Sequence, residues 1–91
     1  MKSKKVLHKG ESGHLSDLVI GQKCIVTGLH HDNKEVRRRL LDMGITTGVE
    51  ITIKKIAPLG DPYDISLRGY ELCCRKRDLE TIDIEVIEWW K

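Results

Sequence analysis

The sequence contains 91 residues, with 16 Lys and Arg against 14 Asp and Glu and a formal net charge of +2. This length fits one domain with a small core, and the near balance of charge excludes strong generic attraction to nucleic acid or to an acidic membrane. No apolar run approaches the roughly 18 residues of a membrane span, and the polar N-terminus lacks the apolar stretch of a signal peptide. We therefore expect a soluble cytoplasmic protein without direct membrane insertion.

The cysteines and the aromatic residues limit how the core is built. Cysteine occurs three times, with Cys73 and Cys74 adjacent, and this arrangement does not make a disulfide framework. We expect free thiols that fill small apolar positions. Because Phe is absent and Tyr and Trp occur twice each, Leu, Ile and Val must form most of the core.

The composition divides the chain into a tail, a domain and a short extension. Residues 1–13 are rich in Lys, Ser and Gly and show no apolar period, which predicts a disordered N-terminal tail. We place the folded domain at 14–88 and a C-terminal extension at 89–91.

The domain begins with a helical turn and a strand. Residues 15–18 predict one turn that directs two leucines to the core, and Gly21 turns the chain. Residues 22–29 alternate as a half-buried strand, with Cys24 and Val26 on one face.

One amphipathic helix follows. Asp32 with Glu35 three residues later is a capping box, and Asn33 takes the cap if the helix starts one residue later. The apolar residues at helical spacing are Val36, Leu40 and Met43. Gly44 suits the left-handed position after the helix, because it has no Cβ to clash there.

The rest of the chain predicts short strands separated by turns. The predicted strands are 50–56, 64–67, 70–75 and 82–86, and the turn residues are Gly48, Gly60, Pro62 and Gly69. Residues 76–81 predict one helical turn, with Leu79 plugging the end of a barrel.

Together these elements predict a mainly β fold, a small five-stranded SH3-like barrel with one inserted α-helix. A ferredoxin-like fold is the weaker alternative, because it needs a second long helix and 76–81 is too short to supply one.

Several short motifs, in this order and at this spacing, resemble the FeoA family of small cytoplasmic accessory proteins of bacterial ferrous-iron uptake. The matching residues are Leu18 with Gly21, Arg39-Leu40-Leu41, Met43-Gly44-Ile45, Gly48, Pro58, Gly60-Asp61-Pro62, Leu72-Cys73-Cys74-Arg75, Leu79, Ile82 and Ile84. Two features depart from the family pattern: Cys73 and Cys74 replace a small residue and a leucine, and the Trp89-Trp90 end lies beyond it. The same barrel is the C-terminal domain of repressors related to the diphtheria toxin regulator, but no helix-turn-helix precedes it here.

The resemblance implies a non-enzymatic protein that supports the FeoB membrane transporter through its cytoplasmic GTP-binding region, the G domain. It implies no cofactor, and it connects the chain with transition metal ions at the level of the family.

The residues themselves predict neither a metal site nor a catalytic site. The side chains able to bind metal are His8, His14, His30, His31, Asp32, Cys24, Cys73 and Cys74, and none has a ligand spacing such as C-x-x-C or H-x-x-x-H. We interpret His30 and His31 as exposed loop residues. No nucleophile turn and no phosphate-binding glycine loop occurs either, so we expect no enzyme activity.

Two features are candidates for partner binding. Arg37, Arg38 and Arg39 lie about 100° apart on a helix, so Arg37 and Arg38 face outward while Arg39 lies nearest the core side. The two outward arginines are either a solvated face or part of a surface that complements an acidic partner. For Trp89 and Trp90, either Trp89 covers the open end of the barrel, or the pair packs on a second copy of the chain or on the membrane partner.

A second hypothesis is an SH3-like nucleic-acid-binding or transcription-regulator module. It requires a basic face with interleaved aromatic residues, whereas acidic residues are spread along this chain, so we expect no nucleic acid partner. Recognition of proline-rich peptides requires an aromatic groove, which Tyr63 and Tyr70 alone hardly provide.

Overall fold

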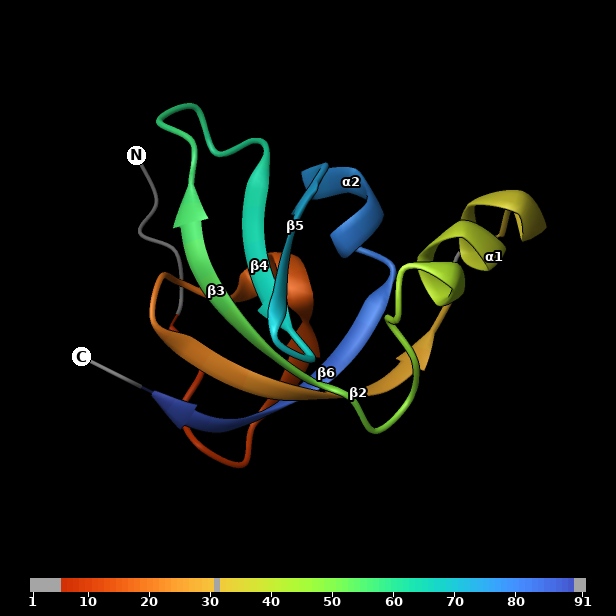
Figure 1. The fold of residues 1–91 in the computed structure, drawn as a ribbon. Helices are drawn as coiled ribbons and strands as arrows, with labels where there is room; N and C mark the ends of the chain where they lie inside the picture. Colours follow the sequence, from red (N-terminus) through yellow and green to blue (C-terminus); the bar gives the residue numbers. More distant parts are fainter. Residues whose placement is uncertain (1–5, 31, 90–91) are drawn as a thin grey trace.

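The computed structural model describes residues 6–30 and 32–89, without the side chains of residues 88 and 89. In this part of the chain the elements are β1 (Ser12–His14), the 3-10 helix η1 (Leu15–Asp17), β2 (Gln22–Leu29), α1 (Lys34–Asp42), β3 (Glu50–Ile56), β4 (Tyr63–Leu67), β5 (Tyr70–Cys74), α2 (Lys76–Leu79) and β6 (Ile82–Trp89). The strands form one antiparallel sheet in the order β1-β6-β2-β3-β4-β5. Figure 1 shows a strongly curved sheet, with α1 carried outward beyond the end of β2.

The mainly β class is confirmed, but the described part of the chain contains six strands where five were predicted. The additional strand is β1, which pairs with β6 through Ser12 and Glu85. Before it, the Gly10 amide donates to the Val86 carbonyl at 2.7 Å. The Gln22 side chain donates to the Leu7 carbonyl at 2.6 Å, and Leu7 packs against the core.

The predicted disordered tail is therefore wrong from residue 7 to residue 13, while residues 1–5 lie outside the described residues. The physical reason is that backbone hydrogen bonds to β6 order this segment. Such bonds leave no apolar period in the sequence, so composition alone misplaces the start of the fold.

Helix α1 starts at the later of the two predicted positions. The Asn33 side-chain oxygen accepts hydrogen bonds from the Glu35 amide at 2.8 Å and from the Val36 amide at 3.4 Å. Asn33 is thus the N-cap, and the capping box that starts at Asp32 is wrong. Asn33 makes the better cap because its side-chain oxygen accepts hydrogen bonds from two backbone amides of the first turn, those of Glu35 and Val36.

The end of α1 follows the prediction. Gly44 has φ +94°, the left-handed conformation expected after a helix. The Gly44 amide donates to the Leu41 carbonyl and the Ile45 amide to the Leu40 carbonyl, at 2.9 and 3.0 Å. These bonds close the last turn and direct the chain toward β3.

The core lies inside the curved sheet and consists mainly of Leu, Ile and Val. It takes buried side chains from every strand except β1: Cys24, Val26, Ile51, Ile53, Tyr63, Ile65, Leu67, Cys74, Ile82, Ile84 and Val86. Leu40 of α1 and Leu79 of α2 are fully buried, so Leu79 fills the position predicted for it. The alternation along β2, β3 and β4 therefore gives the correct inward faces.

The hairpin turn predicted at Arg68 and Gly69 is confirmed, whereas some strand ends differ from the prediction in small ways. The hairpin between β4 and β5 turns at Arg68 and Gly69, with φ 50° and 86°, so a residue other than glycine also takes a left-handed conformation there. At the C-terminus, β6 extends to Trp89, whose backbone pairs with Gln22. Trp89 is thus a strand residue and not part of an extension, because β2 offers partners along its whole length.

Candidate docking surface

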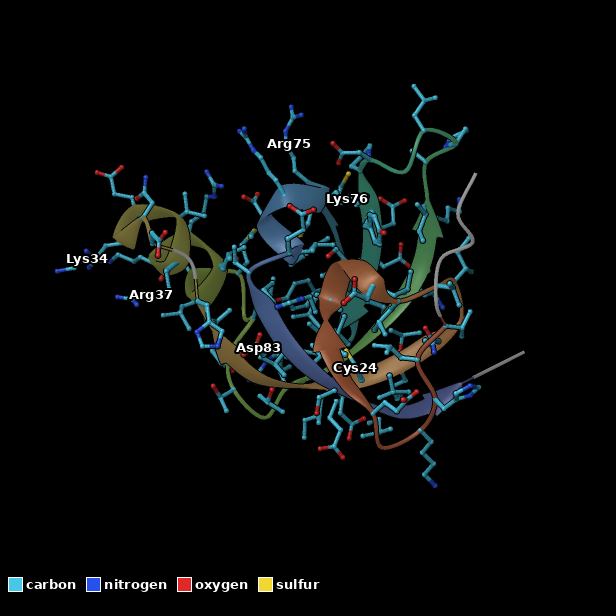
Figure 2. All side chains as sticks on the ribbon, turned by 180° about the vertical axis from the view of Figure 1, so that it is seen from behind. Cys24, Lys34, Arg37, Arg75, Lys76 and Asp83 are labelled. Carbon is cyan, nitrogen blue, oxygen red and sulfur yellow. The ribbon has the colours of Figure 1, made fainter. Side chains whose placement is uncertain are left out.

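The outer face of α1 carries a cationic stripe. Lys34, Arg37, Arg38 and Leu41 are all exposed, with Leu41 at 41%. Residues three and four positions apart share one face of a helix, so these four side chains form a continuous surface, which we call the α1 stripe. Figure 2 shows Lys34 and Arg37 pointing away from the sheet.

The α1 stripe retains its charge, since no carboxylate in the described part of the chain lies within ion-pair distance of Lys34, Arg37 or Arg38. Arg39 differs from them. Its guanidinium lies 3.5 Å from a carboxylate oxygen of Asp78, so it connects α1 with α2. The expected outward direction of Arg37 and Arg38 agrees with their exposure, but the expectation that Arg39 lies on the core side is wrong, because its side chain is 60% exposed and reaches across to α2.

The Trp89-Trp90 end stays a prediction. The backbone of Trp89 ends β6, but its side chain and the whole of Trp90 lie outside the described residues. Neither of the two alternatives for this pair is tested by the fold.

The cysteine side chains are poorly suited to act as nucleophiles. Burial raises the pKa of the Cys24 thiol to about 12 and that of the Cys74 thiol to about 11. Cys73 is exposed, but desolvation and a hydrogen bond with the Asp64 carboxylate raise its pKa as well. All three groups are therefore neutral thiols at neutral pH. Cys24 and Cys74 fill core positions as predicted, whereas the prediction is wrong for Cys73, which is exposed.

Pairing of distant strands brings together a polar cluster that sequence reasoning missed. Asp83 of β6 lies between two histidines, with one carboxylate oxygen 3.5 Å from His14 Nε2 and the other hydrogen-bonded to His30 Nε2. Asp17 lies 3.6 Å from His14 Nδ1. The expectation that His30 is a plain loop residue is therefore incomplete. The sequence signal was absent because the three residues meet only through the register of β1, β6 and β2.

The histidines and aspartates of this cluster contact one another, and they are not arranged as a set of ligands around one ion. In the residues that the structure describes, no three His, Cys, Asp or Glu side chains are arranged to hold a metal ion. The same part of the chain contains no helix long and apolar enough to cross a membrane.

Comparison with known proteins places this geometry among proteins of iron transport. The FeoA domain family matches residues 13–86. A Porphyromonas gingivalis protein described as an Fe(2+) transport protein A/Fe(2+) transporter FeoB fusion protein is 32% identical over 73 residues. The match covers 80% of this chain but 8% of that protein, so the chain spans a small part of its relative.

Solved structures agree with the fold. A FeoA-like protein from Clostridium acetobutylicum is 39% identical, with a TM-score of 0.78 over 93% of this chain and 95% of that one. A FeoA from Stenotrophomonas maltophilia, described as a procaryotic SH3 domain protein and complexed with zinc, is 21% identical with a TM-score of 0.70, over 79% and 88% of the two chains. The latter supports the SH3-like fold alone, which is the fold predicted from the sequence.

Proposed function

The chain belongs to the FeoA family, and from this premise we propose that it is a non-enzymatic accessory protein of ferrous-iron uptake. It acts in the cytoplasm, where it docks on the GTP-binding G domain of a FeoB-type membrane transporter. The fusion protein of P. gingivalis supports this assignment, because it joins the two parts in one polypeptide. Covalent linkage raises the effective concentration of one part at the other, which is useful where the two must meet.

The observation that carries the docking proposal is the α1 stripe. Its cations lie beside an exposed leucine and away from the core, so a partner can cover them without disturbing the fold. Unpaired positive charge attracts a partner with an acidic surface and raises the rate of association. Leu41 then supplies apolar area at the C-terminal end of the stripe, which slows dissociation.

The proposal treats Fe(II) as cargo of the transporter and not as a ligand of this chain. The raised pKa values of the thiols and the lack of a three-ligand group in the described residues favour this role. A nucleic-acid-binding role is less favoured, because acidic side chains such as Glu50, Glu71 and Glu80 interrupt the exposed surface.

The test reverses the charge of the stripe. Arg37→Glu combined with Arg38→Glu leaves the packing of Leu40 untouched, so the melting temperature should not change. Binding to the soluble cytoplasmic region of the transporter should weaken through the association rate, more strongly at low salt, and cellular iron uptake should fall. Association rates at several salt concentrations and uptake of labelled Fe(II) measure these effects.

The matched control is Lys54→Glu with Lys55→Glu, an equal change of charge on exposed positions of β3. This variant should bind and support uptake like the original chain. Unchanged binding and uptake in the arginine variant would contradict the proposal and move the interface elsewhere, with the Trp89-Trp90 end as the next candidate.

A further inference from the structure

A second surface lies where β5, α2 and the C-terminal half of α1 meet. These elements border a hollow of about 300 Å³ whose charged lining consists of Arg39, Arg75, Arg77 and Asp78. A neighbouring hollow of about 250 Å³ shares Cys73, Cys74 and Arg75 with it and is also lined by Asp61 and Pro62. None of these residues belongs to the α1 stripe, so this surface goes beyond the function proposed above.

The hollow carries an excess of positive charge. Asp78 is its one acidic lining residue, and it lies 3.5 Å from Arg39. Arg75 and Arg77 have no carboxylate within 4 Å among the described residues. Figure 2 shows Arg75 extended away from the ribbon. Two guanidinium groups without a partner favour a carboxylate, which each of them can bind through two parallel hydrogen bonds.

The hollow adjoins an unpaired sheet edge. Strand β5 is the last strand of the sheet and packs mainly against β4. Because the hairpin turns in two residues, Leu67 and Tyr70 form a hydrogen-bonded pair. From there, hydrogen-bonded and non-hydrogen-bonded pairs alternate along the two strands, so Glu71 and Cys73 are in non-hydrogen-bonded pairs with β4. The peptide groups of Glu71 and Cys73 therefore point away from β4, and no described residue bonds to them.

We propose that the edge of β5 and the arginine hollow together bind an extended, acidic segment of a protein partner. The segment adds a strand to β5 by pairing with the peptide groups of Glu71 and Cys73, as in other cases of strand addition. One of its carboxylates enters the hollow between Arg75 and Arg77. The backbone bonds supply affinity, and the arginines select an acidic sequence.

A second copy of the chain fits this edge less well. Antiparallel pairing of two β5 strands brings the turn at Arg68 and Gly69 of one copy toward the arginines at the end of the other strand. Arg68 would add a further cation to a hollow that already has an excess of them, and like charges placed opposite each other destabilise strand pairs. An acidic segment supplies the opposite charge.

The probe is a capped seven-residue peptide of alternating Val and Glu, added to the full chain labelled with ¹⁵N. We expect the amide signals of Glu71 and Cys73 to shift and their hydrogen exchange to slow. Arg75→Glu with Arg77→Glu should weaken binding about tenfold or more, and Arg75→Gln with Arg77→Gln should weaken it less. Both substituted positions, Arg75 and Arg77, are exposed, and the NMR spectra of the two variants should show an intact fold.

Three controls separate the parts of this proposal. Lys54→Glu with Lys55→Glu, on β3, should bind the peptide as the original chain does. A peptide with Lys in place of Glu should not bind, and a peptide with N-methylated backbone amides should lose binding because it cannot pair with a strand. Since iron uptake is not measured, failure here leaves the role of the α1 stripe untouched.

Three results would overturn the inference. The first is the absence of shifts at Glu71 and Cys73 at millimolar peptide. The second is equal binding of the N-methylated peptide, which would mean that the arginines bind an acidic group without strand pairing. The third is a dimer through β5, detected by sedimentation, that the peptide does not dissociate.

Discussion

Gly44 shows how one residue can be required for two independent reasons. Its φ of +94° is a conformation that side chains with a Cβ rarely adopt. In addition, a Cβ at this position would lie 2.5 Å from the hydroxyl of Tyr70, which donates a hydrogen bond to the Met43 carbonyl. The sequence predicts the first reason from the end of the helix, but the second depends on a distant strand.

We expect Gly44→Val to lower the free energy of unfolding by at least about 1 kcal/mol, because the backbone is strained and the Tyr70 hydroxyl must move. Thermal or urea unfolding measures the loss. Gly44→Ala in a Tyr70→Phe background separates the two causes, since that background removes the hydroxyl. If Gly44→Val unfolds like the original chain, the left-handed turn is not required.

Two adjacent leucines allow a matched test of the direction that α1 faces. Leu40 is fully buried, whereas Leu41 is 41% exposed. Leu40→Ala should cost about 2–5 kcal/mol through the cavity it leaves, and Leu41→Ala should change stability by about 0.5 kcal/mol or less. Urea unfolding of both variants gives the comparison. Equal losses would mean that the helix is rotated from the orientation described above.

At the scale of elements, the local sequence pattern predicts which residues form strands and which of their faces is buried. It does not predict which distant segments pair with one another. The strands β2, β3 and β4 alternate clearly, so their inward faces follow from the sequence. Strand β1 has three residues and no apolar pattern, and it is ordered by β6, which lies about seventy positions along the chain. The cluster of His14, His30 and Asp83 was missed for the same reason, because its members share a site only once the register is known.

The sequence allows two N-cap residues for α1, Asp32 and Asn33, and the structure selects Asn33. Because Asn33 accepts bonds from two amides of the first turn, Asn33→Ala should lower stability by about 0.5–2 kcal/mol. Asp32→Ala is the control and should cost less, since Asp32 is exposed and precedes the cap. The melting temperatures of the two variants decide the point, and a larger loss for Asp32→Ala would restore the capping box that starts there.

On the scale of the whole molecule, the charged side chains of the two proposed surfaces are separate from the apolar core. The α1 stripe and the arginine hollow lie on the exterior, while the core is built from apolar side chains and neutral thiols. Surface charge can therefore change without loss of the fold, because exposed pairs contribute little to stability. This separation suits a protein whose proposed work is contact with partners. The family resemblance predicts that work from the sequence, whereas the surfaces depend on how the chain folds.

The same arrangement predicts that metal does not support folding. No three His, Cys, Asp or Glu side chains in the described residues are placed to bind one ion, and the core consists of apolar side chains and thiols. The midpoint of thermal unfolding should therefore be equal with chelator and with excess Zn(II) or Fe(II), measured under reducing, anaerobic conditions. A ligand that binds the folded state alone would raise the midpoint in a concentration-dependent way.

The controls for this last prediction are His30→Ala and Cys73→Ala, which remove an exposed imidazole and an exposed thiol. Neither variant should alter the response to metal if the chain binds none. A rise of several degrees with Fe(II) that either substitution abolishes would contradict the prediction. Such a rise would mean that the imidazole of His30 leaves Asp83 to bind the ion, or that Cys73 loses its proton despite its raised pKa, and iron would then contact this protein on its way to the transporter.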